Sequence, residues 1–166
     1  MATGGERSES RVEVTVDDLV LAVLFAEAER PVNGGLMLMK LLFLVGKEID
    51  PRFDSVLSFF PKDFGPYSRR VAQSLKRLVN GQLVDSRRNL SDSSDFERTD
   101  FSLTPQGLLA ASEAFHKLDP GTRVKLSQLR RGAEELGYSG ILRYVYSKYP
   151  EYADLSKIRE EVEVDY

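Results

Sequence analysis

The sequence predicts a mainly α-helical fold with a small β-hairpin, and three observations in the middle of the chain support this. An amphipathic basic helix follows the Gly65-Pro66 break and ends at Gly81. Two short apolar segments, residues 82–85 and 100–103, enclose a polar Ser- and Asp-rich stretch and are typical of two strands joined by a long loop. Thr104-Pro105 combines a capping side chain with a proline at the first helical position, which begins another helix. A helix, a hairpin and a capped helix in this order indicate a winged helix-turn-helix with additional C-terminal helices.

Two more helices are expected before this segment. Residues 15–18 resemble a capping box and predict that the first helix begins there. Its inward face is expected to hold Leu19, Val20, Val23 and Leu24. Residues 31–35 are rich in Gly and Pro and indicate a turn, and a second helix is expected over about 36–49. The short apolar run 55–60 is expected to be a strand or a buried loop.

Helices are also expected after the hairpin, with Gly137 ending one of them and Pro150 breaking another. These helices cover residues 105–118, 120–136, 139–148 and 155–162. The chain is therefore expected to divide into a disordered tail at 1–13, a winged-helix domain at 14–118 and a helical extension at 119–166 packed on it.

Composition excludes most kinds of catalytic chemistry. The chain has no cysteine and a single histidine, His116, so thiolate sites, disulfides and histidine clusters cannot be built. Adjacent acids such as Asp17-Asp18 suit helix caps better than acid–base pairs, and no Gly-rich phosphate loop is present. We therefore expect no catalytic residue, no metal site and no cofactor.

Charge is distributed unevenly along the chain. The net charge is −3, yet residues 66–88 carry six basic side chains and one acid, whereas residues 151–166 carry six acids and two bases. A basic segment that coincides with an exposed helix and hairpin favours nucleic-acid contact more strongly than the total charge opposes it.

No segment is expected to enter a membrane. The first residues are polar, without the apolar run of a signal peptide, and the apolar stretch 16–28 contains three acids and is too short to span a bilayer. A cytoplasmic location is expected.

Part of the chain resembles the MarR- and PadR-like winged-helix regulators. The resemblance covers residues 66–115 and is carried by Gly81-Gln82-Leu83-Val84 and by Leu103-Thr104-Pro105-Gln106-Gly107, which is similar to the "Leu-Thr-x-x-Gly" run of those proteins. It implies a recognition helix, a wing and a following helix.

A second resemblance covers more of the chain. Residues 39–44, Met-Lys-Leu-Leu-Phe-Leu, and 64–68, Phe-Gly-Pro-Tyr-Ser, are similar to the "Lys-Leu-Leu-Tyr … Tyr-Gly-Pro" layout of the Panacea domain. Residues 144–152 resemble a run in related uncharacterised prokaryotic proteins of the YwgA type. The Panacea resemblance implies an antitoxin that neutralises a toxin by protein contact, although the long polar wing departs from that family. The insert at 50–64 also separates the two helices of the helix-turn-helix more widely than usual.

The candidate DNA contacts lie on the basic helix and at the base of the hairpin. Arg69, Arg70 and Gln73 are expected to face base edges, because Arg pairs bidentately with guanine and Gln with adenine. Phosphate contacts are assigned to Lys76, Arg77, Arg87 and Arg88. The alternative is an ordinary solvated helix face.

The tyrosines near the C-terminus predict either a partner surface or the completion of the core. Tyr144, Tyr146 and Tyr149 cannot share one helical face, so at least one is expected to point outward. Leu142 and Val145 are expected inside, and Tyr146 in a homodimer contact. The sequence therefore favours a homodimeric duplex-DNA-binding regulator without catalytic activity. The alternative is an antitoxin-type module that binds a partner toxin.

Overall fold

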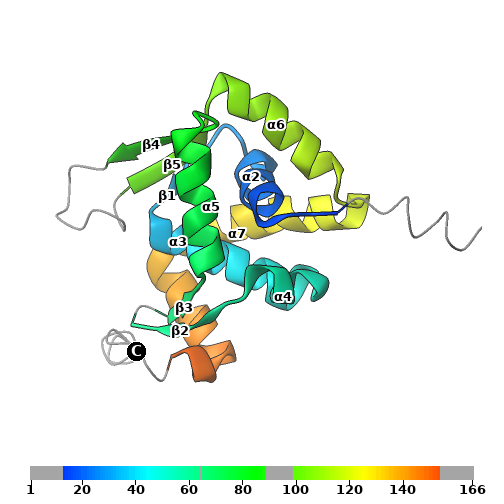
Figure 1. Cartoon of the computed structure of the whole chain (residues 1–166). Coiled ribbons are helices and arrows are strands. Elements are labelled where there is room, and N and C mark those ends of the chain that lie inside the picture. The colour runs from blue at the N-terminus through cyan, green and yellow to red at the C-terminus, as the bar shows by residue number, and fades with distance from the viewer. Residues whose placement is uncertain (1–12, 64, 89–98, 154–166) are drawn as a thin grey trace, which may run out of the picture.

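The protein is mainly helical with two small antiparallel sheets, as the computed structural model shows (Figure 1). The structure describes residues 13–63, 65–88 and 99–153. In chain order its elements are α2 (Val16–Ala26), β1 (Val32–Asn33), α3 (Gly35–Leu44), the π-helix η1 (Val45–Ile49), α4 (Arg52–Leu57), β2 (Phe60–Lys62), β3 (Gly65–Tyr67), α5 (Arg69–Asn80), β4 (Val84–Arg88), β5 (Thr99–Leu103), α6 (Pro105–His116), α7 (Pro120–Lys148) and the 3₁₀-helix η2 (Pro150–Tyr152).

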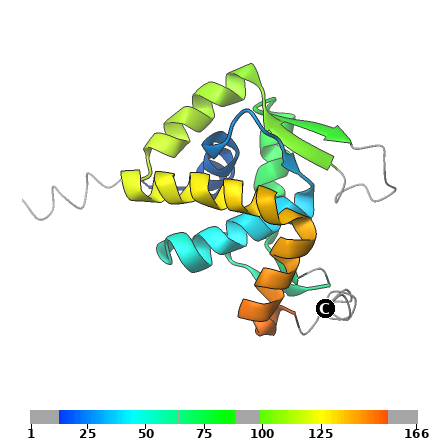
Figure 2. The same cartoon turned by 180° about the vertical axis from the view of Figure 1, so that it is seen from behind.

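Helix α2 occupies the centre of the molecule. It begins with the expected capping box, in which Thr15 and Asp18 bond each other's backbone N–H groups. All six residues from Leu19 to Leu24 are buried, so the helix is apolar on every side rather than along one stripe. Helices α5 and α6 pack on it from two different sides and α7 crosses behind it in the view of Figure 1 (Figures 1 and 2).

The expected hairpin is confirmed, and it is part of a three-stranded sheet in the order β1-β5-β4. In β4 and β5, Val84 lies opposite Leu103 and Arg88 opposite Thr99. The expectation of a plain turn at 31–35 was incomplete, because Val32 and Asn33 pair with β5. Val32 is 3% exposed, and this burial favours an extended edge strand over a solvated turn.

The expectation of a strand or buried loop at 55–60 was wrong. Residues 52–57 form helix α4, whose Phe53 and Leu57 are one helical turn apart and both buried. Ser58, at φ 56°, ends the helix in the left-handed region. The chain then forms a second hairpin, β2–β3, in which Pro61 lies opposite Pro66, so the Gly65-Pro66 break belongs to a strand.

The expected break at Gly137 is confirmed as a kink within one long helix, α7. Gly137 has φ 74° and ψ 173°, outside the helical region, and the helix continues on both sides of it. Figure 2 shows the change of direction in α7. The helix expected at 155–162 and residues 1–12 of the expected disordered tail lie outside the described residues.

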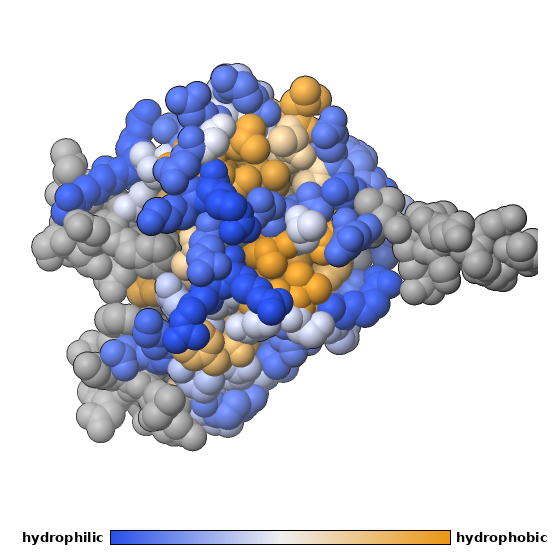
Figure 3. All heavy atoms as spheres, in the orientation of Figure 1, coloured by the Kyte–Doolittle hydropathy of each residue, from blue (hydrophilic) through white to orange (hydrophobic). Residues whose placement is uncertain are grey.

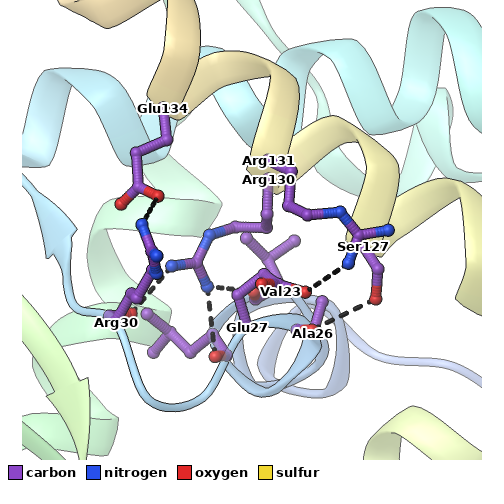
Figure 4. A network of polar contacts seen from close by, with 9 residues as sticks. Val23, Ala26, Glu27, Arg30, Ser127, Arg130, Arg131 and Glu134 are labelled. Atoms are coloured by element: carbon purple, nitrogen blue, oxygen red, sulfur yellow. Dashed lines mark hydrogen bonds and ion pairs between the residues drawn. The ribbon is translucent and has the colours of Figure 1, made fainter.

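Arg130 joins α7 to the C-terminal end of α2 (Figure 4). Arg130 is only 6% exposed. Its guanidinium donates hydrogen bonds to the carbonyl oxygens of Val23 at 2.8 Å, Leu24 at 3.2 Å and Arg30 at 2.8 Å. Carbonyls at the end of a helix lack partners within it, so a buried end needs such donors. Ion pairs of Arg30 with Glu134 and of Arg131 with Glu27 surround the guanidinium.

Gly107 allows α6 to begin against the loop before β4. Thr104 caps α6 by accepting from the Gly107 N–H at 2.9 Å, and its hydroxyl donates to the Gln82 carbonyl at 2.7 Å. A Cβ on Gly107 would lie 1.8 Å from the Leu83 carbonyl oxygen. The Thr and Gly of the "Leu-Thr-x-x-Gly" run therefore perform a structural task.

We expect Gly107→Ala to destabilise the fold by about 2–3 kcal/mol or more, because the clash is with backbone and no side chain can move aside. Urea unfolding measures this. Gly132→Ala in α7 is the matched control: a Cβ there meets no atom within 4 Å, so alanine should stabilise the helix by up to about 1 kcal/mol. Equal effects of both substitutions would contradict the close approach at Gly107.

Arg130→Met should destabilise the protein by about 3–5 kcal/mol, because it retains much of the apolar stem but leaves buried carbonyls of α2 without donors. Arg131→Met, which removes a charged partner of Glu27 at an exposed position, should cost less than about 1 kcal/mol. Thermal unfolding of the two variants compares them. A small effect at Arg130 would show that α2 does not need this cap.

Candidate nucleic-acid interface

Helix α5 is formed and oriented by its own sequence pattern. Ser68 caps it by accepting from the Val71 N–H at 3.1 Å. Val71, Leu75 and Leu78 recur at helical spacing and are all buried. This apolar face packs on α2, so the opposite, polar face of α5 is turned to solvent.

All seven predicted DNA-contact residues are exposed. Because side chains alternate along a strand, Arg88 lies on the face of the sheet that Ser86 turns to α5, and Arg87 lies on the opposite face. Five lie on α5 and two on the adjoining strand β4: Arg69, Arg70, Gln73, Lys76 and Arg77, with Arg87 and Arg88. Figure 3 shows the hydrophilic band over α5 that the exposed side chains of this helix form. A shallow hollow of about 230 Å³ separates α5 from the sheet, with Lys76 and Ser86 at its edges.

The first turn of α5 is held by the segment that precedes it. In the structure this segment covers residues 45–67, from η1 to β3, and includes the expected insert at 50–64; it is called the insert below. The buried Ser68 hydroxyl donates to the Leu57 carbonyl at the end of α4. Arg70 donates to the Val56 carbonyl at 3.0 Å, and the Arg69 guanidinium lies 4.7 Å from the centre of the Phe60 ring. The two arginines expected to enter a groove are thus in contact with this chain's own insert.

Near its other end, α5 is tied to α2 through Asp17. The Asp17 carboxylate accepts from the buried Ser74 hydroxyl at 2.5 Å and from Arg77 at 2.7 Å. The Arg77 side chain is 57% exposed, so the ion pair is solvated and contributes little stability. Its consequence is electrostatic, because a carboxylate beside Arg77 reduces the attraction of that residue for phosphate.

The middle of α5 also carries Gln73 and Lys76, which alternate with the residues bonded to Asp17. Both are exposed, and within the part of the chain that the structure describes no hydrogen bond or ion pair engages either side chain. On β4, Arg87 lies directly opposite Asp100 of β5 and Arg88 opposite Thr99. The tip of the expected wing, residues 89–98, lies outside the described residues.

The sequence did not identify the side chains that hold α5 in place. Asp17 was interpreted as part of a helix cap, and Phe60 as part of a buried segment. Ser68 could have been found, because a serine directly before an amphipathic run is an N-cap signal. The Asp17 contacts join residues about sixty positions apart, and the Phe60 contact reaches Arg69 across the β2–β3 hairpin, so neither has a signal in the local pattern.

The tyrosine prediction was correct for the core positions and wrong for Tyr146. Leu142 and Val145 are buried as expected. Tyr146 is only 6% exposed and belongs to the core, because it packs near Gly65 and α3, so its side chain faces no second copy. Of the three tyrosines, Tyr144 is the exposed one.

Tyr144 and Tyr149 converge on Glu48 of η1. Both hydroxyls donate to the Glu48 carboxylate at 2.8 Å, and Lys148 pairs with it at 2.9 Å. Partial burial by itself raises the pKa of Glu48, but the hydrogen bonds from Lys148, Tyr149 and Tyr144 outweigh it and lower the pKa below its ordinary value. Burial and the same carboxylate raise the pKa of Tyr149. This cluster attaches the end of α7 to the insert.

The described residues contain no group of three or more His, Asp or Glu side chains placed to hold a metal ion. The His116 ring packs against Phe25 and Phe115, and its Nδ1 lies 2.7 Å from the Ser112 carbonyl oxygen, which makes it a packing residue. No helix among the described residues combines the length and apolar character needed to cross a bilayer.

A comparison with models of known protein families finds no match to this chain, and a comparison with curated proteins finds none either. The resemblances to winged-helix regulators and to the Panacea domain therefore stay predictions.

We expect Glu48→Gln to destabilise the protein by about 1 kcal/mol at neutral pH, because a neutral amide accepts more weakly from two hydroxyls and loses the ion pair. Since folding lowers the Glu48 pKa, its contribution is complete above the unfolded value of about 4.3 and is lost as the pH falls through the folded value. Urea unfolding at several pH values checks this. Glu151→Gln, at an exposed position, is the control. If Glu48→Gln remained less stable than the unmodified protein at a pH well below about 4, the predicted loss of the Glu48 contribution at low pH would be contradicted.

Proposed function

We propose that this protein is a winged-helix regulator that binds duplex DNA in the cytoplasm and has no catalytic activity. The order of elements supports the proposal. Strand β1 lies between α2 and α3 and joins the sheet of the β4–β5 hairpin, and α5 directly precedes that hairpin. This corresponds to the helices, small sheet and wing of a winged helix, with η1, α4, β2 and β3 as an insert.

The observation that carries the proposal is the exposed basic face of α5 beside the exposed arginines of β4. Arg69, Arg70 and Lys76 are exposed on α5, and Arg88 lies on the face of the sheet that is turned to this helix. Duplex DNA attracts such a surface through its phosphates, and a helix of this length fits the major groove. The net charge of −3 does not oppose this, because salt screens distant acids while nearby cations act at contact distance.

We further propose that the protein acts as a homodimer, since two copies would read two half-sites. Tyr146 takes no part in this contact because it is buried. The exposed apolar residues Leu109, at 69%, and Val124, at 56%, are candidate members of the surface instead.

An antitoxin-type protein-binding module is the second proposal, and the insert is the observation that favours it. Because Ser68 is buried and Arg70 is bonded to α4, the end of α5 that usually leads into a groove has protein directly beside it. In this case the exposed residues of α6 and α7 would contact a partner toxin.

We expect the full chain to bind duplex DNA with strong salt dependence. Contacts to about four to six phosphates should give a log–log slope of about −4 to −5. Fluorescence anisotropy with a labelled duplex over a salt series measures this slope, and Arg87→Gln together with Arg88→Gln should reduce it by about 2. Lys125→Gln, on α7 behind α2, removes a charge outside the proposed interface and should leave the slope unchanged.

Two outcomes would argue against DNA. Absence of binding at micromolar protein in low salt would remove the proposal and leave the protein-binding module. If Lys125→Gln reduced the salt slope as much as the changes at Arg87 and Arg88, the basic face of α5 and β4 would not be the contact surface.

A further inference from the structure

The contacts of α5 divide its exposed residues into two groups, and this division bears on how DNA would be read. Residues 69, 73, 76 and 80 follow each other at spacings of four, three and four, so they form one stripe along the helix. Arg70 and Arg77 lie beside this stripe, on the flank that meets α4 and α2, as their bonds to Val56 and Asp17 show.

We propose that Gln73 and Lys76, in the middle of α5, read base edges, whereas Arg69 and Arg70 hold phosphate. This assignment rests on the proposed DNA binding. It keeps Gln73 as a reader of bases, as expected from the sequence, and exchanges the other roles, because the sequence assigned bases to Arg69 and Arg70 and phosphate to Lys76.

The first argument is the position of the insert. The hydroxyl of Ser68, directly before α5, is buried against Leu57, so α4 and the β2–β3 hairpin stand beside the first turn of α5. Protein beside the first turn limits how far that end can enter a groove about 12 Å wide. The middle of the helix lies one to two turns further on, where Gln73 and Lys76 are exposed and Lys76 faces the hollow between α5 and the sheet rather than the insert.

The second argument is the restraint on the two arginines. Arg70 is fixed by donation to the Val56 carbonyl, and Arg69 by stacking on Phe60, so each guanidinium is held at the edge of the insert. A guanidinium held in one position is well prepared to bind a phosphate, which recurs regularly along the backbone. Reading bases requires the side chain to extend into the groove, and extension would break these contacts.

The third argument is the chemistry of the two side chains in the middle. Gln73 carries the donor and acceptor pair that matches the N6 and N7 edge of adenine, and Lys76 donates to O6 and N7 of guanine. Neither is engaged by another side chain or carbonyl of the described residues. The preferred site therefore contains adenine and guanine at neighbouring positions in each half-site.

The experiment selects a preferred duplex for the full chain from a random pool and compares its affinity with that of a scrambled duplex of equal composition. Gln73→Ala and Lys76→Ala should each reduce the ratio of the two affinities by roughly 5- to 150-fold. Arg69→Gln and Arg70→Gln should weaken binding to both duplexes by one common factor and reduce the salt slope by about 1 each.

Glutamine is used at the arginine positions because it removes the charge but keeps a planar donor for the Val56 carbonyl and the Phe60 ring. Circular dichroism and thermal unfolding confirm that each variant is folded. Lys125→Gln is the control for the loss of one charge away from α5, and it should change neither affinity ratio nor slope.

The outcomes separate the two proposals. If the arginine variants change the preferred sequence while Lys76→Ala weakens binding to both duplexes equally and leaves the affinity ratio intact, the roles are those expected from the sequence and the present assignment is overturned. If the unmodified protein binds no duplex in low salt, the proposed function is overturned and the assignment with it.

Discussion

The structure depends on one constraint, which is the burial of the central part of α2. Six consecutive residues, Leu19 to Leu24, are buried, so the helix must be covered on every side. The N-terminal cap of this helix lies at the surface, whereas the carbonyl groups near its C-terminal end are buried and need donors from the protein. The capping box of Thr15 and Asp18 satisfies one end and the buried Arg130 the other. Helices α5, α6 and α7 take their places because they supply this cover.

The same constraint positions the candidate interface. The apolar face of α5 packs on α2, which turns the basic face outward, and Asp17 at the start of α2 holds Ser74 and Arg77. The insert then fixes the other end of α5 through Ser68, Arg69 and Arg70. A surface helix attached at both ends is a rigid platform, and rigidity lowers the entropy lost when it binds a partner.

Short motifs in this chain mark structural tasks, and their functional meaning depends on what surrounds them. Thr104 and Gly107 cap α6 and admit the Leu83 carbonyl at close approach, so the run that resembles winged-helix regulators is explained by packing alone. The tyrosines near the C-terminus likewise have two different structural roles, which depend on the residues that each one contacts. Tyr146 completes the core, whereas Tyr144 and Tyr149 bond to Glu48 and attach α7 to the insert.

The sequence by itself determined the features that depend on neighbouring residues. These are the capping box at Thr15, the amphipathic α5, the hairpin and the break at Gly137, because caps, periodicity and glycine conformation act within a few residues. It also placed all seven candidate DNA contacts on the surface. Only the tertiary structure decided that α4 is helical, that Tyr146 is buried and that the insert holds Arg69 and Arg70. A short apolar run such as the one in α4 does not distinguish a helix from a strand. The burial of Tyr146 and the contacts of Arg69 and Arg70 join separate elements, and local sequence pattern does not report which elements will meet.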